Sequence, residues 1–272
     1  MDFLSTAIDA VLRAYFAAFS VAPPVVGLTV LAVLAGIGML WIASKTSNQA
    51  SIKQVKRRVA ASLLELRVFD DEPAVTGRAL KSLIGANARY IGLALRPAVV
   101  MAIPMVLLLM HLESFYGFAP LKPDTETTLT VRMGPGWNIA GPAPTISAPP
   151  EVSVTSPAVR VTAAREITWR LKPTAPVSGN VSLMISGRSV DKQIEAGSGQ
   201  RLVAPRRVSS ELARLWTPGE RKIAEADVEW MELVYPEASL PVLGFEVNWL
   251  VWFFAVSIVT ALVFRKKLGV VI

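Results

Sequence analysis

The chain contains no cysteine and only one histidine, His111, among its 272 residues. Without cysteine there can be no disulfide framework, thiol nucleophile or thiolate metal site. One histidine excludes a metal site built from several imidazoles, and no phosphate-binding glycine loop or Gly-x-Ser-x-Gly elbow is present. His111 and Glu113 could pass a proton, although an interfacial histidine near a carboxylate is more often inert. The sequence therefore predicts no catalytic residue, metal site or cofactor, and argues against an enzyme.

Long apolar runs are abundant instead, with 52% hydrophobic residues and a mean hydropathy of +0.45. Val25–Ser44 has no charged residue and is long enough to cross a hydrocarbon core of about 30 Å. Within it, Ala32 and Gly36 form a small-residue face of the kind that packs helices in membranes. Two further runs, at 91–112 and 245–264, reach a similar length by including some polar residues. We expect three membrane spans, although the second run could be a buried core hairpin.

The distribution of charge predicts the orientation of these spans. Lys45–Arg96 holds ten Lys and Arg against four Asp and Glu, whereas Leu112–Asn248 is nearly balanced, with 14 basic and 15 acidic residues. Arg265–Lys267 directly follows the third run. Because cytoplasmic segments carry the excess of Lys and Arg, we expect the N-terminus outside and the tail 265–272 in the cytoplasm. The net charge of +7 is thus mostly a topology signal, and specific DNA binding is not expected.

Residues 1–24 are expected to form an outer interfacial segment. Apolar residues recur at helical spacing over 3–20, and Pro23-Pro24 then ends the pattern. An amphipathic helix of this kind beside a span is expected to lie in the interface plane. The alternative is that it lengthens the first span.

Residues 45–90 predict a cytoplasmic helical hairpin, similar to a short coiled coil. From Ile52 to Leu66, apolar residues fall three and four apart, surrounded by basic residues. Asp70–Pro73 breaks this pattern and favours a new helix start, because acidic residues and proline are preferred in the first turn. We expect the second helix to continue into the second span.

The composition changes abruptly after the second span, and residues 113–244 predict an extracytoplasmic β-rich domain. Short alternating or β-branched segments are separated by Pro, Gly and Ser clusters, as in a β-sandwich. The expected strands are Glu126–Met133, Val152–Thr155, Ala158–Thr162, Glu166–Lys172, Val181–Ser186 and Val228–Tyr235. Gly134–Pro150 is too rich in proline for a central strand and predicts an extended loop, and Ser209–Leu215 predicts one or two helical turns. The fold class is therefore an α + β membrane protein.

Arg96 is the most informative single residue. An ionisable side chain at membrane depth is costly and is a functional candidate by default, so Arg96 could line an aqueous groove for client proteins. Its position near the cytoplasmic end of the run equally allows the side chain to snorkel to the headgroups. Lys45, at the end of the first run, is the other candidate for such a groove. Pro97 and Pro104 are expected to bend the second span.

Lys53, Lys56, Arg57 and Arg58 form a basic cluster just inside the first span. Such a cluster could contact ribosomal RNA or anionic lipid, each basic residue near a membrane surface contributing about 1 kcal/mol to lipid attraction. It could also serve only to determine the topology.

The order of these segments resembles the YidC/Oxa-type membrane protein insertase superfamily. The likeness is to its short three-span members, such as archaeal YidC-like proteins and the insertase subunit of the ER membrane complex. The second span opens with Arg96-Pro97 and a second proline at Pro104, similar to the family's entry of a basic residue followed by proline. The likeness covers about residues 10–112 and the third span.

This resemblance implies an insertase-like biogenesis factor that gives client proteins a hydrophilic foothold in a locally thinned bilayer. The partners it implies are lipids, nascent membrane proteins, the ribosome and other membrane subunits, and the expected location is a cell membrane, most simply a bacterial inner membrane. The alternative is a membrane-anchored subunit whose extracytoplasmic β domain binds partners in an envelope or transport complex. That alternative is motivated by the size of the β domain, which takes up about half of the chain.

Overall fold

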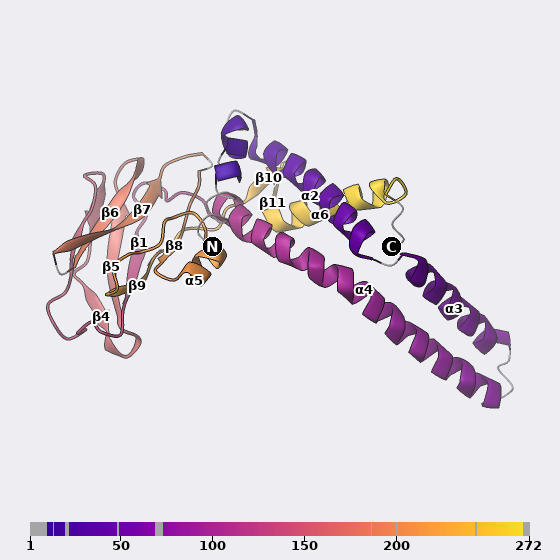
Figure 1. Ribbon diagram of the computed structural model, residues 1–272. Coiled ribbons are helices and arrows are strands. Elements are labelled where there is room, and N and C mark those ends of the chain that lie inside the picture. The colour runs from indigo at the N-terminus through magenta and orange to yellow at the C-terminus, as the bar shows by residue number, and fades with distance from the viewer. Residues whose placement is uncertain are drawn as a thin grey trace. The chain divides into compact units, whose positions relative to one another are not determined.

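Figure 1 shows the computed structural model, which describes residues 10–268 apart from 13, 20–21, 48, 69–72, 186, 200 and 243. The described chain is α + β, as the sequence predicts, with long apolar helices and antiparallel sheets. It divides into two compact units. One comprises the N-terminal residues up to Gly27 and Leu107–Trp249, and the other comprises Leu28–Val106 and the residues from Leu250 onward.

The apolar runs and the predicted hairpin form long helices. These helices are α2 (Pro24–Thr46), α3 (Gln49–Val68), α4 (Pro73–Tyr116) and α6 (Trp249–Phe264). α2 and the Leu80–Tyr116 part of α4 are long and apolar enough to cross a membrane. α6 is equally apolar but has only 16 residues. By length and composition, the described chain therefore has two candidate spans and one shorter apolar helix.

α4 is a single helix that joins the second arm of the hairpin to the second apolar run. The expected continuation of one into the other is thus confirmed. Its first residue is Pro73, as the preference for proline in the first turn predicts. Residues 70–72 of the predicted break lie outside the described residues. Pro97 and Pro104 lie inside α4, and the helix assignment is uninterrupted at both.

The third apolar run is helical over a shorter range than the expected 245–264. Phe245–Val247 forms strand β11, which pairs antiparallel with β10 (Leu240–Val242), and the helix begins only at Trp249. The hairpin places Glu246 opposite Pro241, at an exposed position. The charged residue at the start of the run therefore belongs to a β-hairpin, which explains why the helix is short.

α2 and α6 contact each other through small and polar residues. Ala32 is fully buried, and a Cβ added to Gly36 would lie 2.7 Å from the Ser257 carbonyl oxygen. The Ser257 hydroxyl donates to the Ala32 carbonyl over 3.1 Å, and Trp252 Nε1 donates to Thr29 Oγ1 over 2.9 Å. The small-residue face of the first run is thus a helix-packing face, as expected, because only small side chains allow two helix backbones to approach this closely.

The N-terminal segment is partly described. Residues 10–12 and 14–18 are helical, whereas 3–9, 13 and 20 of the predicted helix lie outside the described residues. The Tyr15 hydroxyl donates to the Gly27 carbonyl over 2.8 Å. This bond ties the segment to the first turn of α2.

Aromatic rings connect the ends of the apolar helices within one unit. The centre of the Phe16 ring lies 3.9 Å from the centre of the Phe115 ring and 5.4 Å from the centre of the Tyr116 ring. Tyr116 also stacks on Trp249, the first residue of α6, at 6.3 Å, and its hydroxyl donates to the Pro24 carbonyl over 3.3 Å. The start of α2, the end of α4 and the start of α6 therefore converge on Tyr116.

The region from Thr127 to Leu233 contains two antiparallel sheets. The larger has the order β3-β5-β1-β9-β8, with β4 also paired to β5, and the smaller has the order β2-β6-β7. The strands of the larger sheet are β1 (Thr127–Met133), β3 (Val152–Val154), β4 (Val159–Val161), β5 (Glu166–Pro173), β8 (Arg206–Val208) and β9 (Val228–Leu233). Those of the smaller are β2 (Thr145–Ser147), β6 (Val177–Ile185) and β7 (Arg188–Ala196).

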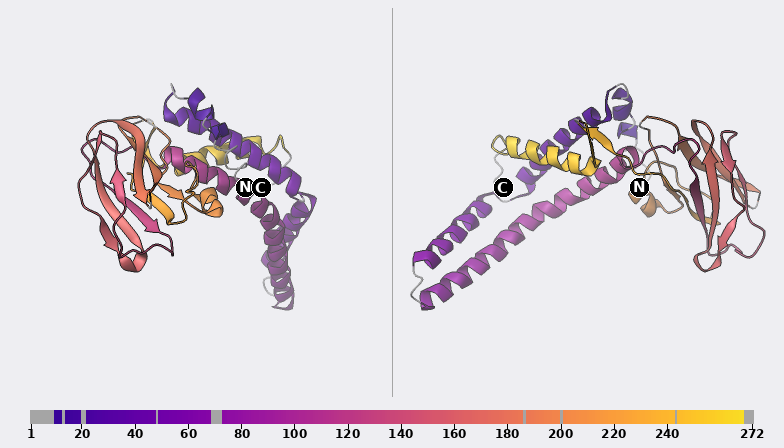
Figure 2. Two further views of the ribbon diagram at one scale, coloured as in Figure 1. Left: turned by 60° about the vertical axis from the view of Figure 1, so that its left-hand side comes forward. Right: turned by 180° about the vertical axis from the view of Figure 1, so that it is seen from behind.

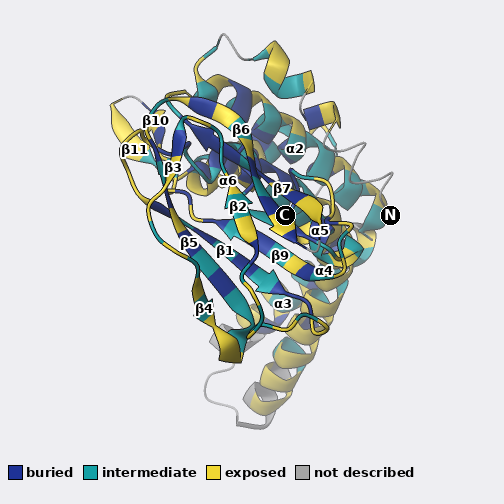
Figure 3. Cartoon of the chain, turned by 90° about the vertical axis from the view of Figure 1, so that its left-hand side faces the viewer, coloured by how far each residue is buried: buried dark blue, intermediate teal, exposed yellow. Residues whose placement is uncertain are grey.

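The two sheets share one hydrophobic core, as the sheets of a sandwich do. Val131 and Trp169 of the larger sheet and Leu183 and Ile194 of the smaller belong to it. Buried residues alternate with more exposed ones along β1 and β5, which Figure 3 shows by colour. All six expected strands are present, at β1, β3, β4, β5, β6 and β9.

Two expectations for this region need correction. Thr145–Ser147, inside the proline-rich stretch predicted as a loop, forms β2 at the edge of the smaller sheet. An edge position needs only one ladder partner, so prolines on either side are tolerated there. β7 was not expected at all, because its charged residues hide the alternation. The helical turns near 209–215 are confirmed as α5 (Glu211–Trp216), capped by Ser210.

Candidate functional site

Arg96 and Lys45, the two residues predicted to form a client groove, both lie at the surface of the structure. Arg96 on α4 and Lys45 in the last turn of α2 are both exposed. Within the described part of the chain, neither makes a hydrogen bond or an ion pair. A client groove formed by Arg96 and Lys45 therefore stays a prediction.

α3 and α4 run antiparallel and form the predicted hairpin, which Figure 2 shows from two sides. Val55 and Ala86 are buried between the helices, and the Ser62 hydroxyl donates to Ser82 Oγ over 3.2 Å. Lys56, a member of the predicted basic cluster, lies 5.7 Å from the centre of the Tyr90 ring. Small apolar and hydroxyl residues thus set the register of the two helices.

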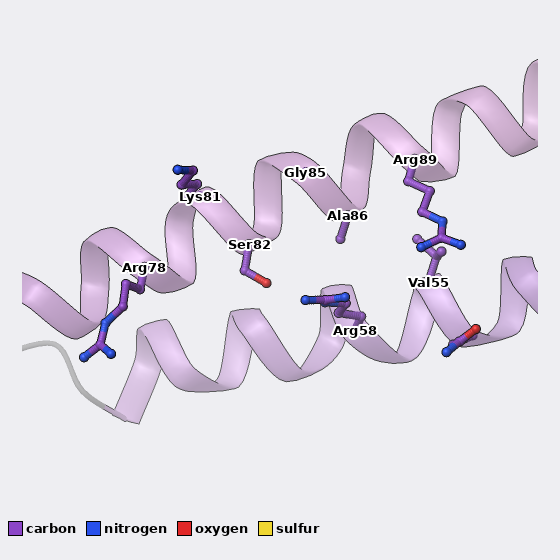
Figure 4. Close-up of a pocket in the computed structure, with 9 residues that line it drawn as sticks. Val55, Arg58, Arg78, Lys81, Ser82, Gly85, Ala86 and Arg89 are labelled. Carbon is purple, nitrogen blue, oxygen red and sulfur yellow. The ribbon is translucent and has the colours of Figure 1, made fainter.

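This register creates a groove of about 470 Å³ between the two helices. Its polar lining residues are Gln54 and Arg58 of α3 and Arg78, Lys81, Ser82 and Arg89 of α4. In Figure 4, Arg58 lies between the helices, Arg89 reaches toward α3 beside Val55, and Lys81 stands on the opposite side of α4 at the rim. The described residues that line the groove include four cations and no carboxylate.

A groove with this lining attracts anions. Arg58, Lys81 and Arg89 are exposed and, among the described residues, have no ion-pair partner. Like charges held close together repel each other, and this repulsion is relieved when an anionic group binds between them. Guanidinium groups bind carboxylates and phosphates with two parallel hydrogen bonds, so Arg58 and Arg89 are suited to either.

The groove follows α4 away from the apolar run. At 1.5 Å per residue, Arg89 lies about 10 Å and Arg78 about 27 Å along the helix from Arg96. A headgroup layer is only about 5–8 Å deep on each side of the hydrocarbon core. If α4 crosses a bilayer with Arg96 near its edge, most of the groove stands clear of the headgroups.

Sequence reasoning found one residue of this groove and missed the others. Arg58 belongs to the predicted basic cluster, whereas its neighbours Lys53 and Arg57 are exposed and do not line the groove. Arg78, Lys81 and Arg89 were counted only as part of the cytoplasmic charge. The spacing of eleven residues places Arg78 and Arg89 on the same face of a helix, and this was the available signal.

The two residues considered for proton transfer lie in different environments. His111 is buried, with its Nδ1 2.7 Å from the Leu107 carbonyl oxygen of its own helix, while Glu113 is exposed. A buried imidazole bonded to its own helix has the arrangement of a structural residue. No group of three or more potential metal ligands occurs among the described residues.

A second ionic cluster, which the sequence did not indicate, lies inside the β-rich domain. Lys192 of β7 is fully buried, and its ammonium donates to the Ala204 carbonyl over 2.6 Å, to the Gln193 carbonyl over 3.2 Å and to the Glu220 carboxylate. Burial lowers the pKa of Lys192 from its ordinary value, and the Glu220 carboxylate opposes this shift. All three protons of the ammonium are engaged, so the pair is a structural contact rather than a binding site.

Comparisons with protein-family models, with curated proteins and with solved structures found no match.

Proposed function

We propose that this chain is an insertase-like membrane protein biogenesis factor whose hairpin receives client complexes at the cytoplasmic face. It crosses a cell membrane, as in a bacterial inner membrane, three times through α2, α4 and α6, with the N-terminus outside. The observation that carries the proposal is the basic groove between α3 and α4. Arg58, Lys81 and Arg89 are exposed there, and Lys81 and Arg89 belong to α4, the helix that continues into an apolar run.

The convergence of helix ends on Tyr116 supports this topology. The start of α2, the end of α4 and the start of α6 must lie on one side of the membrane if the three helices cross it in sequence. Tyr116 contacts Pro24 and Trp249, which begin the other two helices. Tyrosine and tryptophan are enriched at membrane interfaces, where their rings are half in contact with lipid and half with water.

The short third helix supports the thinning part of the proposal. α6 has 16 residues and is therefore about 24 Å long, less than the hydrocarbon thickness of about 30 Å. A short span is accommodated by thinning the bilayer around it, which lowers the cost of moving polar client segments across. Arg96 and Lys45 would then offer a foothold to the polar flank of a client.

The groove is tested by two variants that each remove two positive charges from the hairpin, one inside the groove and one outside it. An Arg58→Gln/Arg89→Gln variant removes two groove cations, and a Lys53→Gln/Arg57→Gln variant removes two cations of α3 outside the groove. We expect the first to weaken co-sedimentation of ribosome–nascent-chain complexes with proteoliposomes by roughly tenfold or more, since contacts to charged groups contribute about 1.5–3 kcal/mol each. The second should have a much smaller effect. Equal losses would mean that the hairpin attracts clients by its overall charge and not through the groove, and no loss in either variant would reduce this charge to a topology signal.

The foothold at Arg96 needs a separate test. A photoreactive residue at position 96 in intact membranes should cross-link to nascent membrane proteins during translation. Cross-links to lipid alone would mean that Arg96 snorkels to the headgroups, and would remove the groove inside the membrane from the proposal.

A second candidate function is a partner-binding subunit that works through its extracytoplasmic domain. The specific observation is that α5 exposes Leu212 and Trp216, four residues apart, with 62% and 55% of their surfaces accessible. Tryptophan is enriched at the energetic centres of protein interfaces. A Leu212→Ser/Trp216→Ser variant of the full chain that loses one discrete cross-linked partner, while client insertion persists, would favour this candidate.

A further inference from the structure

A separate cavity of about 320 Å³ lies in the unit that holds the β-rich domain and the ends of the apolar helices. Most of its wall is apolar or aromatic. Phe16 and Phe19 come from the N-terminal segment, Phe115 and Tyr116 from the last turn of α4, and Leu202 from the loop after β7. A volume of about 300–1,000 Å³ and a largely aromatic lining are typical of sites that hold small apolar ligands.

One cation stands at this apolar cavity. Among the described residues that line it, Arg201 alone carries a charge. Its Nη1 donates to Glu195 over 3.3 Å, and 39% of its side chain remains exposed. Glu195 is itself buried and also accepts hydrogen bonds from Ser178 and Gln193, both over 2.7 Å. A guanidinium has five donors, so Arg201 can bind a second anion while it keeps Glu195.

We propose that this cavity binds an anionic phospholipid of the outer leaflet, with an acyl chain against Phe16, Phe19 and Phe115 and the phosphate at Arg201. The position of the cavity supports this ligand, because residues at the start of α2 and the end of α4 line it together with a loop of the β-rich domain, and these helix ends would lie near the headgroups if the helices cross a membrane as proposed. The charge supports it as well, since an apolar wall with one cation at its edge matches an apolar chain with one anion.

The inference assumes that the chain is inserted in a membrane, as proposed above, and is independent of insertase activity. Bound lipid would fix the N-terminal segment against α4, because its chain would lie along both Phe16 and Phe115, whose rings are already in contact. The lipid would thereby be a structural ligand at the convergence of the three helices.

The test uses the full chain in nanodiscs of phosphatidylcholine containing a small fraction of phosphatidylglycerol with a photoreactive group in one acyl chain. Labelled peptides are identified by mass spectrometry. We expect adducts on the peptides that carry Phe16 to Pro24 and Phe115 to be enriched over those of the exposed face of α6. Unlabelled phosphatidylglycerol should compete, whereas added phosphatidylcholine should not.

Four variants separate binding from folding. Ala22→Phe fills the cavity from its wall without touching the Arg201–Glu195 pair, and should abolish the enriched labelling. Arg201→Gln should reduce it by roughly tenfold, the effect of losing one charge-assisted contact, and Arg201→Lys should restore much of it. Arg170→Gln is the matched control, because Arg170 also pairs with a carboxylate, Glu126, on the surface of the same domain.

Each result decides a separate question. Enriched labelling that Ala22→Phe and Arg201→Gln remove and Arg170→Gln leaves intact supports the site. Uniform labelling of α2, α4 and α6, or competition by phosphatidylcholine, means ordinary boundary lipid and overturns it. If no apolar helix is labelled at all, the membrane insertion proposed above is wrong, and the lipid site is wrong with it.

Discussion

Lys192 in the β-rich domain and Arg58 in the hairpin are both basic residues within regular elements, and their surroundings are opposite. Lys192 is fully buried, and the Glu220 carboxylate and two carbonyls engage it. Arg58 is exposed and shares its groove with three other cations and, among the described residues, no carboxylate. An ion can be buried only with a partner, whereas exposed like charges persist because water and salt screen them. The charge of Lys192 is thus occupied by contacts within the fold, whereas the charge of Arg58 remains available to a ligand.

The largest expected effect concerns the buried ion pair between Lys192 and Glu220. Glu220→Ala would leave the Lys192 ammonium buried without its counterion, and we expect the free energy of unfolding to fall by about 3–5 kcal/mol. Urea unfolding of the full chain in detergent, followed by tryptophan fluorescence, measures it. Glu126→Ala is the control, because it breaks an ion pair with the exposed Arg170 and should cost only about 0–1 kcal/mol. Similar losses in the two variants would contradict a structural role for Lys192.

The next effect concerns the packing of α2 against α6. Gly36→Val would place a side chain where even a Cβ lies 2.7 Å from the Ser257 carbonyl oxygen, so the helices must separate. We expect a loss of about 1–3 kcal/mol, the usual cost of overpacking. Gly38→Val adds the same side chain two residues later, where no atom lies within 4 Å of the added Cβ. Thermal unfolding in detergent should therefore separate the two valine variants, and identical behaviour would mean that the helices do not pack through Gly36.

A smaller effect is expected in the pH dependence of the Lys192 site. In Glu220→Gln the carboxylate that raises the pKa of Lys192 is lost, so burial lowers this pKa further below its ordinary 10.5. Between the lowered pKa and 10.5, the unfolded chain binds more protons than the folded one. The free energy of unfolding should therefore rise with pH in this window, by at most about 1.4 kcal/mol per pH unit. Urea titrations from neutral to alkaline pH measure the slope.

If Lys192 stays charged in the folded Glu220→Gln variant, the free energy of unfolding will not rise with pH in this window. The matched variant is Lys192→Met/Glu220→Gln, which lacks the titrating group. It should show no more pH dependence than the rest of the chain produces. A slope that persists in the double variant would assign the titration to a residue other than Lys192.

The helical part of the fold could be predicted from the sequence because its signals are local and periodic. Apolar residues three and four apart mark α3, a first-turn proline marks the start of α4, and an uncharged run marks α2. The start of the third run was misjudged, since an apolar residue such as Phe245 fits a strand as well as a helix. Only its pairing with Val242 assigns it to a strand.

The β-rich domain and the groove depend on pairings that the sequence does not contain. β7 was missed because Lys192 occupies an inward position, and its partner Glu220 is 28 residues away. The groove was missed because its cations come from two helices. Their register follows from contacts such as that between Ser62 and Ser82, so Arg58 could not be matched with Arg89 in advance.

The smallest expected effect is the loss of one hydrogen bond between α6 and α2, compared with the loss of one in the β-rich domain. Trp252→Phe removes the bond from Nε1 to Thr29 Oγ1 between α6 and α2, and Tyr235→Phe removes the hydroxyl that accepts from the buried Glu195 N–H over 3.1 Å. Interhelical bonds in membranes contribute about 0.6 kcal/mol on average, because the separated helices also find partners. A buried N–H left without a partner costs about 1–3 kcal/mol.

We therefore expect Trp252→Phe to cost less than Tyr235→Phe in the same unfolding assay, although Trp252→Phe also shortens the side chain. A Thr29→Val variant separates the two contributions, since it removes the acceptor and preserves the shape of the residue. If Thr29→Val costs as much as Tyr235→Phe, the α2–α6 contact depends on its polar bond as strongly as the β-rich domain depends on its own. The distinction between the two regions would then apply to charges alone, and not to neutral hydrogen bonds.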